Sequence, residues 1–365
     1  MAQRHLDPTD PTTAGPAEPV TPDALVDYLR AQATEFLRAL RLHRESGTGT
    51  AHTGSSPGEE PVDAARALRH SARRITGTLH TFRPLLDPSW SETLHPELAW
   101  LSGTLAREHA YAARLERLLM ALQRLSGAPP FPKQAAAGPG NAGPRSHPAP
   151  TPDRSNLTVG AAKAGALLER QLTLARTRSH SAALQALGSS RFHAVADNVA
   201  VLASEVPLIP AATTTPTDLR PLAAAAHERL CAAVAALPLL TAGHPYNAEA
   251  LVHGLSLDPA PHPQDAPWHH VRLLLRLRRY AHELLEGDTA RDGLGGRMAA
   301  AGAALNRHRD ASEAATAAAA AARTPRIAPA TAYALGVLHA DQRHEVEAAR
   351  FAFQQSWEMK TVSTR

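Results

Sequence analysis

The chain has 365 residues, of which 44% are hydrophobic and 4% aromatic, and its formal charge is +4, from 38 Lys and Arg against 34 Asp and Glu. The hydrophobic content is sufficient for a buried core and excludes a wholly disordered chain. The single cysteine, Cys231, excludes a disulfide framework, so we expect a cytoplasmic protein. No apolar run is long enough to span a membrane, and the polar N-terminus shows no secretory signal; we therefore expect no membrane partner.

Helical periodicity and capping signals predict three helices in the first part of the chain. Residues 1–20 have the composition of a flexible tail, and the Thr-Pro-Asp sequence that starts at Thr21 then begins a helix. Two more helices are expected at about 62–86 and 90–125. Residues 126–156 are rich in Pro, Gly and Ala and are predicted to be a linker.

The second part of the chain has the same character. No strand-like alternation of any length occurs, so the predicted fold class is all-α, built from helical bundles. We expect one domain over residues 21–360, with a first helical half at 21–125 and a second helical half at 157–360. The helices of the second half are predicted at about 157–187, 190–204, 216–238, 268–286, 295–323 and 329–358.

The predicted helix at residues 62–86 has a cationic side and a separate apolar side. Its basic residues recur mainly at steps of three and four, which places them on one helical face, with one arginine flanking that face. No acid follows Asp63 in this helix, so nothing local neutralises the charge. The residues of this first stripe are Arg66, Arg69, Arg73, His80 and the flanking Arg74.

The predicted helix at residues 268–286 carries a second stripe. His269, Arg272, Arg276 and Arg279 step by three, four and three along one face, and leucine and valine fill most of the remaining circumference. A helix this apolar is expected to be buried on several sides, so its stripe should face a cleft. Like charges one turn apart repel, and a phosphate chain would relieve that repulsion through charge-assisted hydrogen bonds. The alternative interpretation is that both stripes are solvated faces or pair with acids of neighbouring helices.

Two echoes indicate an internal repeat. The spacing of the first stripe returns in the second at an offset of 203 residues. The segment that begins at Leu105 is echoed by the segment at Leu305, an offset of 200 residues. Two echoes at nearly the same offset favour a duplicated helical unit.

These segments resemble the conserved-histidine α-helical domain family, CHAD. The resemblance lies in the run from Leu79 to Leu86 (Leu-His-Thr-Phe-Arg-Pro-Leu-Leu), in the stripe that starts at His269, and in the step Leu-Asn-Arg-His-Arg-Asp that contains His308. It covers about residues 20–360. It implies two pseudo-symmetric, antiparallel helical bundles that face each other across a basic channel. It also implies binding of inorganic polyphosphate and association with polyphosphate granules.

The chain departs from the family pattern in its first half. Arg66 replaces the first signature histidine, and the two acids expected after Leu105 are missing. We therefore expect phosphate binding rather than metal-dependent or acid–base chemistry. The residues expected to bind polyphosphate are Arg66, Arg69, Arg73, Arg74, His269, Arg272, Arg276, Arg279 and His308.

Two other functions are alternatives to polyphosphate binding. A metal-dependent hydrolase of polyphosphate or nucleoside triphosphates would need carboxylates beside the basic groove, and only Asp310 stands near a signature residue. A nucleic-acid binder would be expected to carry a known reading module or aromatics interleaved with the basic stripes, and neither is found. The chain also lacks zinc-protease, CxxC, P-loop and dinucleotide motifs, so we expect no catalytic residue, no metal and no cofactor.

Overall fold

A computed structural model of the chain describes residues 19–47, 59–127, 152–214, 217–243, 263–287 and 294–358. Every regular element within these ranges is a helix, which confirms the all-α fold class. Two extended segments within the described ranges form an isolated antiparallel β-bridge between Leu86 and Leu208. Among the described helices, none has both the length and the apolar character that crossing a membrane requires.

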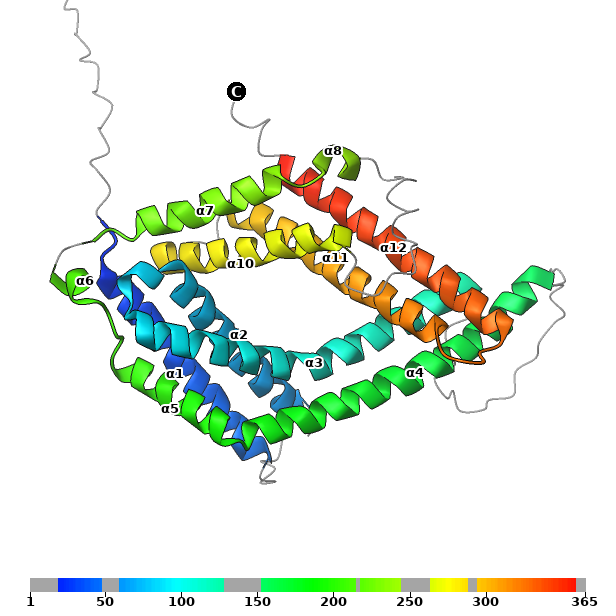
Figure 1. The fold of residues 1–365 in the computed structure, drawn as a ribbon, viewed down its shortest axis with the longest axis horizontal. Coiled ribbons are helices and arrows are strands. Elements are labelled where there is room, and N and C mark those ends of the chain that lie inside the picture. The colour runs from blue at the N-terminus through cyan, green and yellow to red at the C-terminus, as the bar shows by residue number, and fades with distance from the viewer. Residues whose placement is uncertain are drawn as a thin grey trace, which may run out of the picture.

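The helices form an elongated ring in outline (Figure 1). In that view α7 and α10 follow one long side, α4 follows the other, α11 and α12 lie at one end, and α1, α2 and α5 lie at the opposite end. The long helices are α1 (Pro22–Gly47), α2 (Glu59–Thr81), α3 (Pro88–Ser126), α4 (Pro152–Leu187), α5 (Ser190–Ser204), α7 (Arg220–Ala235), α10 (Ala266–Glu286), α11 (Leu294–Ala322) and α12 (Pro329–Glu358). The short ones are η1 (Arg83–Leu85), α6 (Pro210–Thr214), α8 (Leu239–Ala242) and η2 (Pro263–Asp265).

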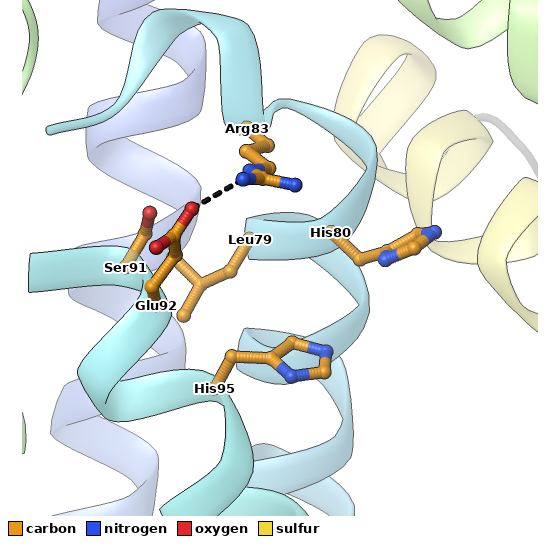
Figure 2. Close-up of a pocket in the computed structure, with 6 residues that line it drawn as sticks. All are labelled: Leu79, His80, Arg83, Ser91, Glu92 and His95. Carbon is orange, nitrogen blue, oxygen red and sulfur yellow. Dashed lines mark hydrogen bonds and ion pairs between the residues drawn. The ribbon is translucent and has the colours of Figure 1, made fainter. Parts of the chain in front are cut away.

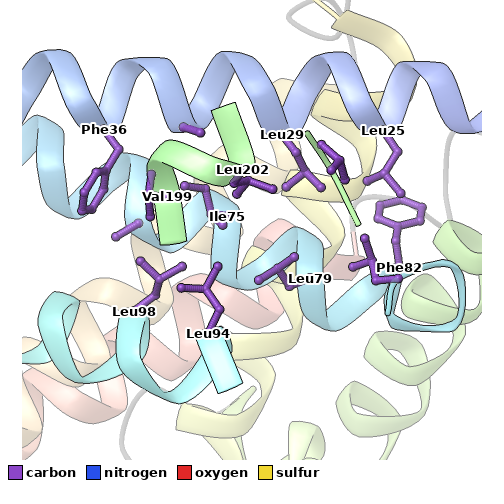
Figure 3. Packing of buried hydrophobic residues seen from close by; sticks show 14 of the residues in the cluster. Leu25, Leu29, Phe36, Ile75, Leu79, Phe82, Leu94, Leu98, Val199 and Leu202 are labelled. Carbon is purple, nitrogen blue, oxygen red and sulfur yellow. The ribbon is translucent and has the colours of Figure 1, made fainter. Parts of the chain in front are cut away.

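The largest hydrophobic core joins α1, α2, the first half of α3 and α5 (Figure 3). Leu25, Leu29 and Phe36 recur along one face of α1 and are fully buried against Ile75 of α2 and Val199 of α5. Apolar residues at helical spacing give each helix one buried stripe and leave its other faces for polar side chains. Because α2 turns its apolar stripe into this core, its arginine stripe faces elsewhere.

Two further cores complete the molecule. One joins the end of α3 to α4 and to the facing parts of α11 and α12, with Leu118, Leu168 and Leu338 fully buried. The other joins α7, α10, α11 and the end of α12 around Trp268, whose ring meets that of Phe353 edge-on at 5.7 Å between centroids. Since α11 and α12 contribute to both of these cores, they connect the two cores to each other.

The predicted helix ranges agree with the observed ones to within a few residues, and the differences lie at helix ends. α4 begins at Pro152, inside the predicted linker, and α1 continues to Gly47. α5 belongs to the second helical half in sequence but packs with α1 and α2, so the two halves of the chain do not form separate cores. Residues 1–18 of the predicted tail and 128–151 of the predicted linker lie outside the described residues. The pseudo-symmetry of two bundles and the channel between them remain predictions.

α2 and α10 cross closely, and this crossing determines how their basic stripes lie. A Cβ atom built on Gly77 would lie 2.5 Å from Cδ2 of Tyr280 and 3.3 Å from a methyl carbon of Leu277. Real Cβ atoms do not approach a ring carbon so closely, so the absence of a side chain at Gly77 lets the two helices meet here. The crossing lies one turn beyond Arg73 on α2.

Candidate functional site

Arg69 and Arg73 of α2 are half-buried, and no carboxylate of the described residues forms an ion pair with either of them. Nε of Arg73 donates a hydrogen bond to the hydroxyl of Ser102 on α3 at 2.9 Å. Burial, followed by repulsion from Arg69 and from Arg276 of α10, lowers the pKa of Arg73 to about 10. Burial also lowers the pKa of Arg69, whose buried Nε has no hydrogen-bond partner among the described residues. These guanidinium groups stay charged at neutral pH, but their surroundings favour the arrival of an anion.

The arginines of α10 lie in the same electrostatic environment. Nε of Arg272 donates to Oδ1 of Asn306 on α11 at 2.7 Å. Burial lowers the pKa of Arg272 to about 10, with repulsion from Arg309, Arg276 and Arg73 as further causes. Burial lowers the pKa of Arg276 as well. Because Arg73 of α2 acts on Arg272 of α10, and Arg276 of α10 acts on Arg73, the two predicted stripes meet in one place.

Arg309 of α11 joins the stripes, and the predictions did not include it. Its charge lowers the pKa of His269 and of four arginines of the two stripes. In each case burial is the larger cause and Arg309 is a smaller one. The four arginines are Arg69, Arg73, Arg272 and Arg276. Its own guanidinium is held by Asp310 at 2.6 Å and by Glu313 at 3.7 Å. The echo of the Leu105 segment at Leu305 was the signal that could have indicated it, since Arg309 follows Leu305 by one helical turn.

The outer members of the two stripes lie at the edge of this group. Arg66 is exposed and repels Arg69, and Arg279 is exposed and repels Arg276. His269 is half-buried, and burial lowers its pKa. The structure therefore brings residues from three helices together. The arginine cluster, as we name it, consists of Arg66, Arg69, Arg73, Arg272, Arg276, Arg279 and Arg309.

Arg74 does not belong to the arginine cluster, because it is paired with an acid, and these surroundings do not support its expected role in phosphate contact. Its Nε donates to Oε1 of Glu283 on α10 at 2.9 Å, and both side chains are about one-third exposed. Burial acts to lower the pKa of Arg74, but Glu283 and then Tyr28 outweigh it, so the pKa is raised. An arginine already neutralised by a carboxylate is a structural contact between α2 and α10.

His308 is also corrected, because it lies inside the protein. The side chain is 1% exposed, and its ring stacks on Trp268 at 5.6 Å between centroids. Nε of Arg350 lies 3.3 Å from its Nε2, and the carboxylate of Asp265 lies 3.6 Å from the same atom. Burial lowers the pKa of His308 to about 4, although Asp265 opposes the shift. His308 cannot reach a chain in solvent; its ring lies 5.5 Å from that of His269, at the edge of the site.

Asp265 is the centre of the buried charges around His308. It is fully buried and accepts hydrogen bonds from Arg343 at 2.8 Å, from Arg350 at 2.7 Å and from Ser312. Burial would raise its pKa, but these donors and His308 hold that pKa well below its usual range. The carboxylate joins the start of α10 to α11 and α12 and so fixes the helix that carries the second stripe.

The chemistry available at the arginine cluster is the binding of anions. Guanidinium groups present planar forks of N–H donors that match the oxygens of phosphates. The carboxylates of Asp310 and Glu313 lie beside Arg309 at one edge. No group of three or more His, Cys, Asp and Glu side chains in the described part of the chain is arranged to hold a metal ion. The geometry therefore favours a polyanion with repeated oxyanion groups.

Comparison with known proteins gives a matching family and matching solved structures, of which two are described by their similarity. The family model described as the CHAD domain matches residues 31–319. PptA from Streptomyces chartreusis is 65% identical to the chain, with a TM-score of 0.74, and the match covers 93% of this chain and 100% of that one. The CHAD domain from the plant Ricinus communis is 16% identical, with a TM-score of 0.45, over 92% of this chain and 97% of that one. Among curated proteins the comparison finds no match.

Proposed function

The chain belongs to the CHAD domain family, and from that premise we propose that it binds inorganic polyphosphate through the arginine cluster, with His269 at its edge. Membership of the family supports an association with polyphosphate in general terms. The choice of residues comes from the contacts between α2, α10 and α11. Association with polyphosphate granules in the cell is part of the same proposal.

The observation that carries the proposal is the mutual repulsion between arginines of different helices. Arg73 of α2 and Arg272 of α10 each have a pKa lowered to about 10, by burial first and by neighbouring arginines second. Within the described residues, no carboxylate forms an ion pair with either side chain. A protein that holds such charges together gains free energy when an anion enters, because each charge-assisted hydrogen bond contributes roughly 1.5–3 kcal/mol.

A flexible phosphate chain suits this cluster better than a single anion. The cluster extends over three helices, and a chain can place successive phosphates against successive guanidinium groups. Binding of this kind releases counterions and so weakens steeply as salt is added. We propose binding without hydrolysis, and phosphate release from long-chain polyphosphate, measured with and without Mg²⁺, tests that part separately.

Replacing the four central arginines tests the proposal directly. The variant R69A/R73A/R272A/R276A should bind labelled long-chain polyphosphate at least about 100-fold more weakly at low salt, because several charge-assisted contacts are lost together. A matched control, R38A/R41A/R124A/R176A, removes four arginines that lie at the surface beside acids. Its net charge changes equally, so equal weakening in both variants would contradict the proposal and indicate binding by overall charge.

A further inference from the structure

A small pocket lies apart from the arginine cluster, between the end of α2, η1 and the first turns of α3 (Figure 2). It has a volume of about 230 Å³. Figure 2 shows the side chains of His80 and His95 on one side of it and the paired Arg83 and Glu92 on the other. We call it the histidine pocket; its lining residues are Leu79, His80, Arg83, Ser91, Glu92 and His95.

The two histidines are brought together by different helices and are not used by the fold. Their ring centroids are 6.1 Å apart with the planes tilted by 39°. His80 is exposed and His95 is partly buried. Among the described residues, neither ring has a hydrogen-bond partner for its nitrogen atoms, so both rings are available to a ligand in the pocket.

The charges around the histidine pocket favour an anion over a cation. Arg83 of η1 and Glu92 of α3 form an ion pair, so their opposite charges cancel. Arg229, exposed on α7, adds a positive charge that acts on His80. A metal ion would need a third ligand, and no set of three His, Cys, Asp or Glu side chains suited to a metal occurs in the described ranges. Protonated histidines beside an arginine instead resemble the donors that hold phosphate oxygens.

The histidine pocket is separate from the arginine cluster. His80 follows Arg73 by seven residues, which is two turns or about 10 Å along α2. α10 crosses α2 between them, where Tyr280 covers Gly77. A ligand in the pocket therefore does not occupy the site of the proposed function, although a long chain could reach both.

We propose that the histidine pocket is a second, proton-linked binding site for a phosphoryl oxyanion, held by protonated His80 and His95. The oxyanion is either inorganic phosphate or one unit of a longer phosphate chain, since both present the same oxygens. This inference goes beyond the proposed function. Binding of inorganic phosphate in the histidine pocket does not depend on polyphosphate binding by the arginine cluster.

The direction of the pH dependence follows from the groups that face the two rings. Burial lowers the pKa of His80, and His95 of α3, Arg229 of α7 and Arg83 of η1 lower it further. Burial also lowers the pKa of His95. Both rings are thus neutral near pH 7, and a bound oxyanion reverses these effects and raises both pKa values. Binding therefore takes up as many as two protons, and it tightens as the pH falls toward the lowered pKa values of the two rings.

Titration of the histidine rings by NMR tests the inference in the full-length chain. Addition of inorganic phosphate, against chloride at matched ionic strength, should raise the pKa of His80 and of His95 and leave the ring resonances of exposed His344 where they are in chloride. The variant H80Q/H95Q should bind tripolyphosphate at pH 6 about tenfold more weakly than wild type, as expected for lost charge-assisted contacts, and equally at pH 8. The matched control H344Q should behave as wild type.

Three outcomes would overturn the inference. The first is that neither ring titrates differently in phosphate or in long-chain polyphosphate. The second is that the resonances of His344 shift as much as those of His80 and His95, and the third is that the two rings respond to Zn²⁺ and not to phosphate. Repeating the titration in R69A/R73A/R272A/R276A separates the two sites. A response to inorganic phosphate that persists there supports the histidine pocket even if the arginine cluster does not bind polyphosphate. A response only to the long chain, lost in that variant, supports the pocket as a site for one unit of a chain held by the arginine cluster.

Discussion

Arg73 and Arg74 are neighbours in the sequence, yet their guanidinium groups have opposite surroundings. Arg73 is repelled by Arg69 and Arg276, whereas Arg74 is neutralised by Glu283. A side chain that is already paired gains little from an added anion, and one surrounded by like charges gains much. At the scale of single residues, the partner of a charge therefore determines whether it binds ligand or supports the fold.

This contrast predicts opposite effects of two adjacent substitutions. R73A should weaken polyphosphate binding by about tenfold or more and leave the melting temperature unchanged or raised, because a desolvated, repelled charge is removed. R74A should leave binding nearly unchanged and lower the free energy of unfolding by about 1 kcal/mol, since a partly exposed ion pair is lost. Fluorescence anisotropy with labelled polyphosphate and thermal unfolding measure the two effects. Equal loss of affinity in both variants would contradict the assignment of Arg74.

The buried histidine predicts how stability depends on pH. The pKa of His308 is lowered to about 4 in the folded protein, whereas an unfolded chain takes up that proton near pH 6.5. The unfolded state therefore binds more protons between these values, and stability falls as the pH drops from about 6.5 to 4, by about 3 kcal/mol from this group. Asp265 adds its own loss of stability mainly below about pH 5, because an unfolded aspartate takes up its proton near pH 3.9 whereas the pKa of the folded residue lies far below that value.

Chemical denaturation at a series of pH values checks this expectation. The variant H308Q should unfold more easily at pH 8, since it disturbs a buried network, but its stability should change less between pH 6.5 and 4 than that of wild type. H344Q removes an exposed histidine and serves as the control. A pH dependence in H308Q as steep as in wild type would exclude His308 as its source.

At the scale of helices, the crossing of α2 and α10 predicts the effect of one added methyl group. In G77A the new Cβ would overlap the ring of Tyr280, so the helices must move apart. We expect a loss of about 1–3 kcal/mol in stability, as for other overpacked sites, together with weaker polyphosphate binding because the two stripes separate. The control is G103A on α3, where nothing lies within 4 Å of an added Cβ and a small gain in helix stability is expected. Wild-type binding and stability in G77A would show that the close crossing does not position the stripes.

The helices and their stripes were accessible from the sequence because both depend on local spacing. The steps of three and four that place Arg69 and Arg73 on one face are fixed by helix geometry alone. The role of Arg74 was not accessible, since its partner Glu283 is 209 residues away along the chain. The burial of His308 likewise depends on Arg350 of α12 and on Asp265, which meet it only in the folded protein.

At the scale of the whole molecule, the formal charge of +4 conceals an uneven distribution. Seven arginines from α2, α10 and α11 form the arginine cluster, and at its edge Asp310 and Glu313 form ion pairs with Arg309. Other arginines, such as Arg114 and Arg124 of α3, pair with acids of α11 and α12. Binding of a polyanion is therefore expected to depend on this local excess and not on the average charge.

The central claim is that stripes from the two halves of the chain form one site. Titration calorimetry of the half-site variants R69A/R73A and R272A/R276A with polyphosphate of defined length tests it most directly. One shared site predicts a single binding event on the arginines in wild type at pH 8, where the histidine pocket is neutral, and a severe loss of affinity in both half-site variants. Two independent binding events in wild type, with one retained at full affinity in each half-site variant, would contradict the claim.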